Sequence, residues 1–318
     1  MRELLFSFCC SVCLLFTSVV YAQPTHFTTS DYHKHQAKEI LFGVGATGLL
    51  GDLGGLNRQG TDYAPIDYEF LMTRYAFHLG YRYRFKPRFA TKSLLQYGLL
   101  QGDDALTTEV YRNYRNIRVK THLIEFSQTL EWIIFNNEHF GKRYRIAGLK
   151  GMRNKNTLIY LIGGVSGFAY FPQAPSGPFL RSLRTEGQGL PGAPKPYSYF
   201  SFGIPMGIGA KIGIDAVWRM SFEFTYTKTF TDYLDDVSGS YYDNAAIEAA
   251  YGPVSAYYAD PSSKENPYWT AHGEIRGHPE TKDAYLFLNV SLIRNITYKR
   301  SKRIKWRYNT RKGTKARW

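Results

Sequence analysis

The chain has 318 residues, a formal net charge of +14 and a mean hydropathy of −0.35. Its three cysteines all lie before residue 14, so the rest of the sequence excludes a disulfide framework, a thiolate metal site and a cysteine nucleophile. After residue 22 no segment approaches the roughly 18 apolar residues that a transmembrane helix needs, which excludes helical spanning.

The first 22 residues have the features of a secretory signal peptide. Arg2 precedes an apolar stretch from Leu4 to Val20, and small residues suited to cleavage end at Ala22. We therefore expect the mature chain to begin at Gln23. An N-terminal membrane anchor is the alternative, and it fits less well because the stretch ends in a cleavage-like site.

Alternating apolar and polar residues dominate the sequence that follows. Residues 23–38 are polar and without pattern, which predicts a flexible N-terminal segment. Strands are then predicted, in chain order, over 39–48, 71–85, 88–102, 121–135, 157–171, 198–212, 218–228 and 283–294. Eight such spans are typical of a bacterial outer-membrane β-barrel, which must close because lipid offers no partner to a free sheet edge.

The second predicted strand shows the alternation clearly. Phe77, Leu79 and Tyr81 share one face, while His78 and Arg82 share the other. Aromatic residues make up 16% of the chain, and they gather at strand ends and on lipid-facing rows of membrane barrels. The sequence therefore predicts an all-β fold, an eight-stranded antiparallel transmembrane β-barrel over 39–294. A soluble lipocalin-like barrel remains the alternative, with polar faces outward and apolar faces inward.

Charged residues on the polar rows predict a filled lumen. An isolated buried charge is costly, so inward charges of opposite sign are expected to pair, which favours a closed interior over an open pore. The predicted lumen network comprises Arg74, Arg82, Lys211, Glu125, Glu131 and Glu223, with Lys92 in the same inward set.

The connections between strands alternate in length. Links after the second and sixth strands are short, whereas those over 49–68, 103–120, 172–197 and 229–282 are long. Long loops of such barrels face outward and short turns face the periplasm. One periplasmic link, 136–156, breaks this rule with 21 residues.

Basic charge is concentrated on the predicted periplasmic face. The link 136–156 and the C-terminal tail 295–318 together carry a net charge of +15, so the rest of the chain is close to neutral. Nucleic acid is implausible for an exported barrel, which leaves a partner protein, anionic lipid or peptidoglycan. The residues predicted to bind a partner are Lys142, Arg143, Arg145, Lys150 and Arg153.

Several local patterns resemble one protein family. The most specific is Thr229-Phe-Thr-Asp-Tyr-Leu-Asp-Asp-Val-Ser238, which contains Asp232, Tyr233, Asp235 and Asp236. The other patterns are Glu39–Gly45, Gly51–Leu53, Gln101–Asp104, Leu123–Phe126, Arg184–Leu190 and Ile204–Gly209. Together they resemble the PorG-type outer-membrane protein of the type IX secretion system over residues 39–294. The tail 295–318 is longer and more basic than this family leads us to expect.

The resemblance implies a non-enzymatic barrel in the outer membrane of a Gram-negative cell. Proteins of this type are thought to anchor a periplasmic ring, made by a lipoprotein and its partner of PorK and PorN type, and in gliding bacteria the ring is associated with motility. Outer-membrane lipids are the other expected partner, and no cofactor, nucleic acid or small-molecule substrate is expected. The alternative is a small surface barrel of OmpX/OmpA type that binds ligands or surfaces through its outer loops.

Aspartates crowd the last outer loop. Asp232, Asp235, Asp236 and Asp243 could supply carboxylates to calcium, but their spacing is not that of an EF-hand, and Ca²⁺ needs six or more oxygens. Turn-forming and hydrogen-bonding aspartates are the simpler interpretation.

Several histidines are candidates for catalytic or metal-binding groups. Asp31, His33 and His35 lie in the N-terminal segment, which is a poor place for a metal site. His78 and His122 invite comparison with barrel hydrolases. His78 falls mid-strand, deep in the predicted barrel, where a hydrogen-bonding role in the lumen is expected, and no serine or carboxylate motif surrounds His122. No catalytic residue is therefore expected.

Overall fold

The computed structural model describes residues 37–53, 69–137, 157–175, 177–214 and 217–296. The expectations for the signal peptide (1–22) and the cysteines lie outside the described residues. Those for the N-terminal segment and the basic tail fall outside them too, apart from residues 37–38 and 295–296.

Eight antiparallel strands close into one barrel. Each strand pairs with its neighbours in sequence, and β1 pairs with β8 to complete the ring. The predicted fold class is thus confirmed. The strands are β1 (Lys38–Leu50), β2 (Arg74–Lys86), β3 (Phe89–Asp103), β4 (Arg118–Asn137), β5 (Thr157–Gln173), β6 (Phe200–Gly213), β7 (Trp218–Thr229) and β8 (Ala284–Asn295).

The observed strand bounds differ from the predicted ones by a few residues. β4 begins at Arg118, three residues before the predicted start, and β2 begins at Arg74 because Phe70–Met72 form a short 3-10 helix, η3. These shifts occur at strand ends, where alternation is least informative.

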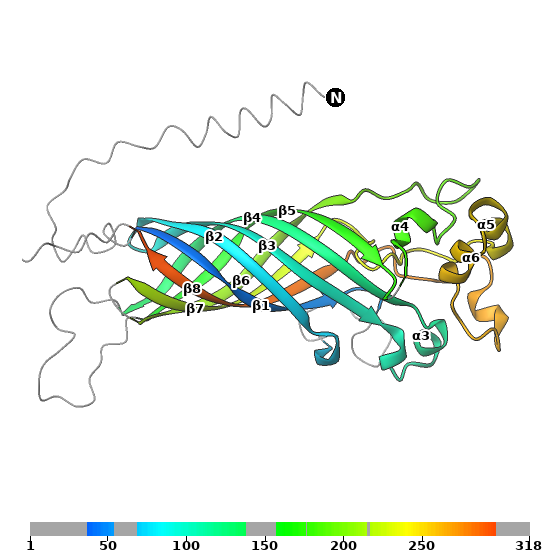
Figure 1. Cartoon of the computed structure of the whole chain (residues 1–318), viewed down its shortest axis with the longest axis horizontal. Helices are drawn as coiled ribbons and strands as arrows, with labels where there is room; N and C mark the ends of the chain where they lie inside the picture. The colour runs from blue at the N-terminus through cyan, green and yellow to red at the C-terminus, as the bar shows by residue number, and fades with distance from the viewer. Residues whose placement is uncertain (1–36, 54–68, 138–156, 176, 215–216, 297–318) are drawn as a thin grey trace, which may run out of the picture. The chain divides into compact units, whose positions relative to one another are not determined.

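Strand direction divides the barrel into two ends, which we call the turn end and the loop end. The turn end carries the short β2–β3 and β6–β7 connections, the β4–β5 link, the start of β1 and the finish of β8. The loop end carries the four long connections between β1–β2, β3–β4, β5–β6 and β7–β8 (Figure 1).

Besides η3, several short helices lie within the described parts of the loop-end connections. They gather beyond the strand ends on that side, as Figure 1 shows. Sequence alternation gave no sign of them. They are η4 (Asp104–Leu106), α3 (Val110–Arg115), α4 (Leu180–Leu183), α5 (Asn244–Tyr251), α6 (Pro253–Ala259) and η6 (Pro267–Thr270).

The outward face of the barrel is apolar and exposed. Val44 is 56% exposed, Phe202 59% and Val165 65%, and similar residues occupy the outward positions of every strand. A soluble barrel would have its apolar rows inside, so this arrangement overturns the lipocalin-like alternative. A closed barrel with an apolar outer belt is built to sit in lipid, as outer-membrane barrels do. Among the helices of the described residues, none is long and apolar enough to cross a membrane.

Inward glycines make room for large side chains in the lumen. A Cβ atom at Gly209 would lie 2.5 Å from the ring of Tyr160, and one at Gly98 would lie 2.8 Å from the ring of Phe287. Both distances are shorter than real carbon contacts. These two glycines therefore reflect how tightly the interior is filled.

Candidate functional site

The turn-end half of the lumen is occupied by paired charges centred on Glu39. Its carboxylate accepts hydrogen bonds from Arg82 Nη1 at 2.9 Å and from Lys211 Nζ at 3.0 and 2.9 Å. Arg219 Nε lies 3.9 Å from the same carboxylate. These side chains are at most 2% exposed, so their charges interact with little screening by water.

A second carboxylate extends this network across the barrel. Arg82 also donates to Glu131, whose other oxygen lies 3.7 Å from Lys92 Nζ. Lys92 donates in turn to Glu223 at 2.6 Å, and the Tyr160 hydroxyl donates to Glu223 at 2.6 Å. Charges from six strands are thereby tied together in the lumen.

The structure brings together four of the six residues predicted for the lumen network, namely Arg82, Lys211, Glu131 and Glu223. Glu125 is buried too, but it accepts from the Tyr285 hydroxyl at 2.5 Å rather than from a cation.

The placement of Arg74 in the lumen network is wrong. Arg74 is partly exposed at the loop-end start of β2, where its Nε donates to Gln101 Oε1 at 2.7 Å. Sequence reasoning also missed Glu39 and Arg219. Glu39 stood at the predicted strand boundary, and the outward parity of Ile40 could have placed it inside.

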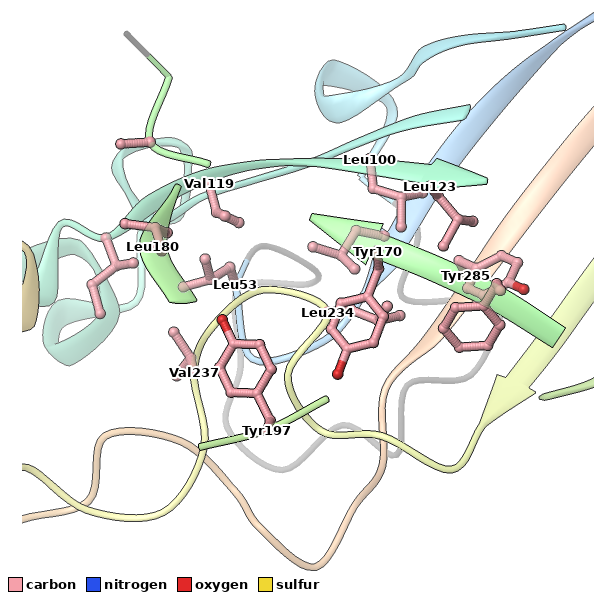
Figure 2. Packing of buried hydrophobic residues seen from close by; sticks show 14 of the residues in the cluster. Leu53, Leu100, Val119, Leu123, Tyr170, Leu180, Tyr197, Leu234, Val237 and Tyr285 are labelled. Atoms are coloured by element: carbon pink, nitrogen blue, oxygen red, sulfur yellow. The ribbon is translucent and has the colours of Figure 1, made fainter. Parts of the chain in front are cut away.

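The loop-end half of the lumen is filled by a hydrophobic cluster. Strand residues such as Leu100, Leu123, Phe168 and Tyr285 pack there against residues that come from the long connections. Figure 2 shows Leu53, Tyr197, Leu234 and Val237 entering the cluster from those connections. We call the folded loop-end connections that close the barrel the cap.

The family motif 229–238 forms the centre of the cap. Leu234 and Val237 are fully buried, and the Leu234 carbonyl accepts from the Thr121 hydroxyl at 2.5 Å inside the barrel mouth. Tyr233 stacks on Tyr197 with ring centroids 4.5 Å apart. The motif is therefore built into the cap core.

Each aspartate of the motif has a structural partner. Asp235 accepts from the backbone N–H of Leu53 and of Val237, both at 3.1 Å, and Asp236 accepts from the hydroxyls of Thr185 and Tyr197. Asp232 accepts from a serine hydroxyl at 2.6 Å. This arrangement agrees with the hydrogen-bonding interpretation of the motif.

Burial dominates the electrostatics of these carboxyl groups. It raises the pKa of Asp232 to about 6, with nearby Asp52 adding to the effect. It raises the pKa of Asp235 and of Asp283 well above the ordinary range, because the carboxylates that surround them also disfavour the charged form. Asp243, the fourth aspartate considered for calcium, instead caps α5 by accepting from Ala245 N. Within the described residues, no group of three or more His, Cys, Asp or Glu is arranged to hold a metal ion.

Two buried arginines join the connections of the cap. Arg115 donates to both oxygens of Asp104 at 2.7 and 2.9 Å, and also to the carbonyls of Asp52 and Arg276. Arg276 donates to Glu186 Oε1 at 2.8 Å. Burial raises the pKa of Glu186 to about 7, against the opposing effect of Arg276. Charge-assisted hydrogen bonds from Arg115 and Arg276 thus connect segments of the cap that are far apart in sequence.

The two histidines considered for catalysis have structural contacts. His78 Nε2 lies 2.7 Å from the Ser291 hydroxyl within the lumen. His122 bonds to the Tyr97 hydroxyl at 2.8 Å and to Gln173 Oε1 at 3.2 Å on the outward face. The first metal candidate, Asp31 with its neighbouring histidines, lies outside the described residues. So do the predicted partner-binding residues Lys142, Arg143, Arg145, Lys150 and Arg153.

Comparison with known proteins places no family name on the chain. No family model matches it, and no curated protein matches it. Solved structures with a similar arrangement include Ail, the attachment invasion locus protein of Yersinia pestis, bound to the heparin analogue sucrose octasulfate. It is 10% identical, with 81% of this chain and 99% of Ail covered and a TM-score of 0.31. Another is the outer membrane protein AlkL in lipid bilayers, 10% identical, with 88% and 97% covered and a TM-score of 0.31. Our assignment of the fold rests on the closed strand order and the apolar belt.

Proposed function

We propose that this protein is a non-enzymatic outer-membrane barrel that binds other molecules at its ends and conducts nothing through its lumen. The filled lumen is the observation that carries this proposal. Paired charges occupy the turn-end half, and the aromatic core of the cap occupies the loop-end half. A barrel of eight strands has an interior that side chains can fill, which fits a scaffold better than a channel.

The loop end supports binding at the cell surface. Aromatic side chains stand exposed on the braced cap, among them Tyr257 at 63% and Tyr268 at 83%. The Trp269 ring packs against Tyr111 in a tilted arrangement, with ring centroids 4.6 Å apart. Rigid, exposed aromatic groups are a common basis for recognising proteins and other ligands, because little side-chain freedom is lost on binding. This is the function that the described geometry supports best.

A second candidate is the anchor of a periplasmic ring in the type IX secretion apparatus. The motif 229–238 favours it, because that motif resembles the PorG-type family and specifies the particular way in which this cap is built. Asp236, for example, bonds to Thr185 and Tyr197 of a different connection, so the sequence pattern is more than a turn signal. The family resemblance implies a lipoprotein and a ring protein of PorK and PorN type as partners at the turn end.

One experiment separates the two candidates. Lys142, Arg143 and Arg145 are reversed to Glu in one variant, and Tyr257 and Tyr268 are changed to Ser in the other. The anchor function predicts that the first variant loses the co-purified ring proteins and protein secretion while the second keeps both. The surface-binding function predicts that only the variant with Tyr257 and Tyr268 changed to Ser weakens the attachment of cells to a ligand or an external surface. If neither variant changes either property, both candidates are wrong.

A further inference from the structure

A polar patch interrupts the apolar outward face of β3 and β4. It consists of Thr91, Ser93 and Gln128. Between the two rims, and apart from His122 near the loop end, the outward positions of the eight strands otherwise carry apolar, tyrosine or glycine residues. Exposed apolar residues precede and follow Gln128 along β4, so the patch lies within the lipid-facing belt.

The patch is organised by a chain of hydrogen bonds. Ser93 Oγ donates to Gln128 Oε1 at 2.5 Å, and Gln128 Nε2 donates to Thr91 Oγ1 at 2.5 Å. Thr91 passes the chain on by donating to the Thr129 carbonyl at 3.2 Å. A primary amide has two N–H donors and two acceptor positions, and the bonds to Ser93 and Thr91 use one of each on Gln128. Amide groups left facing hydrocarbon without partners are costly, so the remaining pair favours a polar contact over lipid.

The surface next to the patch permits close approach. Val165 of β5 pairs with Gln128, and the outward glycines Gly163 and Gly167 flank it. A Cβ atom at Gly163 would have nothing within 4 Å, so the surface is open at that position. Small residues beside polar ones are typical of contacts between proteins within membranes.

We propose that this patch is a lateral contact between two copies of the chain in the membrane. Copies inserted with the same polarity form a symmetric pair only about a two-fold axis along the membrane normal. Such an axis keeps every residue at its own depth, so the polar patch of one copy meets the same patch of the other. The spare N–H and spare acceptor of Gln128 can then pair reciprocally with those of its counterpart. Apart from tyrosines, the described strands carry no other outward polar group at the membrane depth of this patch. The same patch on a second copy is therefore the surface that best complements it.

Cysteine cross-linking in intact outer membranes tests this proposal. Leu130, an outward neighbour of Gln128 on β4, is changed to Cys in the full chain, with the parent chain as the baseline. Val290→Cys is the matched control, because it is also exposed in the belt but lies on β8, four strands away in either direction around the barrel. On mild oxidation we expect a dimer from Leu130→Cys and only monomer from Val290→Cys.

The role of the amide is tested by adding Gln128→Leu to the Leu130→Cys chain. The dimer fraction should then fall about threefold or more, because the substitution removes both reciprocal hydrogen bonds and the loss of even one within a membrane has about this effect. A heat-modifiability gel checks that each variant is folded, and Gln128→Met replaces Gln128→Leu if the latter is not. Equal cross-linking at both cysteine positions, or an unchanged dimer fraction without the amide, would overturn the proposal. A cross-link to a protein of different mass would also overturn it, in favour of a different barrel as the partner.

Discussion

Replacing Glu39 by Ala should be among the most destabilising single changes in the barrel. The Glu39 carboxylate is fully buried and accepts three hydrogen bonds from Arg82 and Lys211, with Arg219 3.9 Å away. Arg82 keeps its bond to Glu131 in the variant, but Lys211 loses both bonds to Glu39. Removing one partner from a buried ion pair typically costs about 3–5 kcal/mol, because the other charge stays buried without compensation.

A matched control comes from an ion pair in the same chain whose arginine is half exposed. Arg118 lies 3.3 Å from Asp103, and its side chain is 50% exposed. Removing such a pair by Arg118→Ala should cost less than about 1 kcal/mol. A third variant changes Glu39 and Lys211 together to Met, which removes a buried anion and a buried cation at once. It should recover much of the stability lost in Glu39→Ala, since apolar replacement of a buried pair is often close to neutral.

Urea unfolding of the refolded barrel in phospholipid vesicles measures these differences. The urea midpoint of Glu39→Ala should lie well below that of Arg118→Ala. If the free energies of unfolding of these two variants agree to within about 1 kcal/mol, the lumen network does not hold the barrel together as its geometry implies.

Two further predictions concern the cap. The pKa of Glu186 is raised to about 7 in the folded cap, whereas the unfolded chain releases this proton near the ordinary pKa of 4.5. The stability of the cap therefore falls as the pH rises from about 4.5 to about 7. Glu186→Gln should reduce the difference in protease resistance between pH 5 and pH 8. A steeper pH dependence in that variant would contradict the assignment. Leu234→Ala should destabilise the cap by about 2–5 kcal/mol through cavity formation, seen as faster proteolysis of the loop connections while the barrel remains heat-modifiable; unchanged proteolysis would show that Leu234 is not part of the core.

Strand periodicity allowed most of the barrel to be predicted. Phe77 and Leu79 face outward and His78 and Arg82 inward, as the alternation on β2 indicates, because side chains of a strand must take opposite faces in turn. Arg74 follows the same parity and was still misplaced. The odd or even position of a residue in a strand tells which face of the sheet its side chain takes. It does not tell how far along the barrel axis the residue lies, and so whether it is in the lumen or at the rim.

The cap could not be predicted from local sequence. Helix α3 has six residues and α4 has four, too few for helix periodicity to be visible. The bond from Leu53 N to Asp235 joins residues 182 positions apart, and nothing in either segment alone indicates it. The sequence marks the aspartates of the motif as a family feature and as hydrogen-bonding groups, but their burial depends on partners from two other connections.

The motif 229–238 also spans the seam at which the barrel closes. Leu53 follows β1 and Asp283 immediately precedes β8, and these two strands pair along the seam, with Leu50 opposite Ala284. Asp235 holds the N–H of Leu53, while Asp283 holds the N–H of Leu234. The motif 229–238 thus links β1 and β8 by hydrogen bonds beyond the last residues that pair between them. Separation of β1 from β8 at this end would first require the bonds of Asp235 to Leu53 and of Asp283 to Leu234 to break. The motif should therefore slow unfolding more than the number of its hydrogen bonds would suggest.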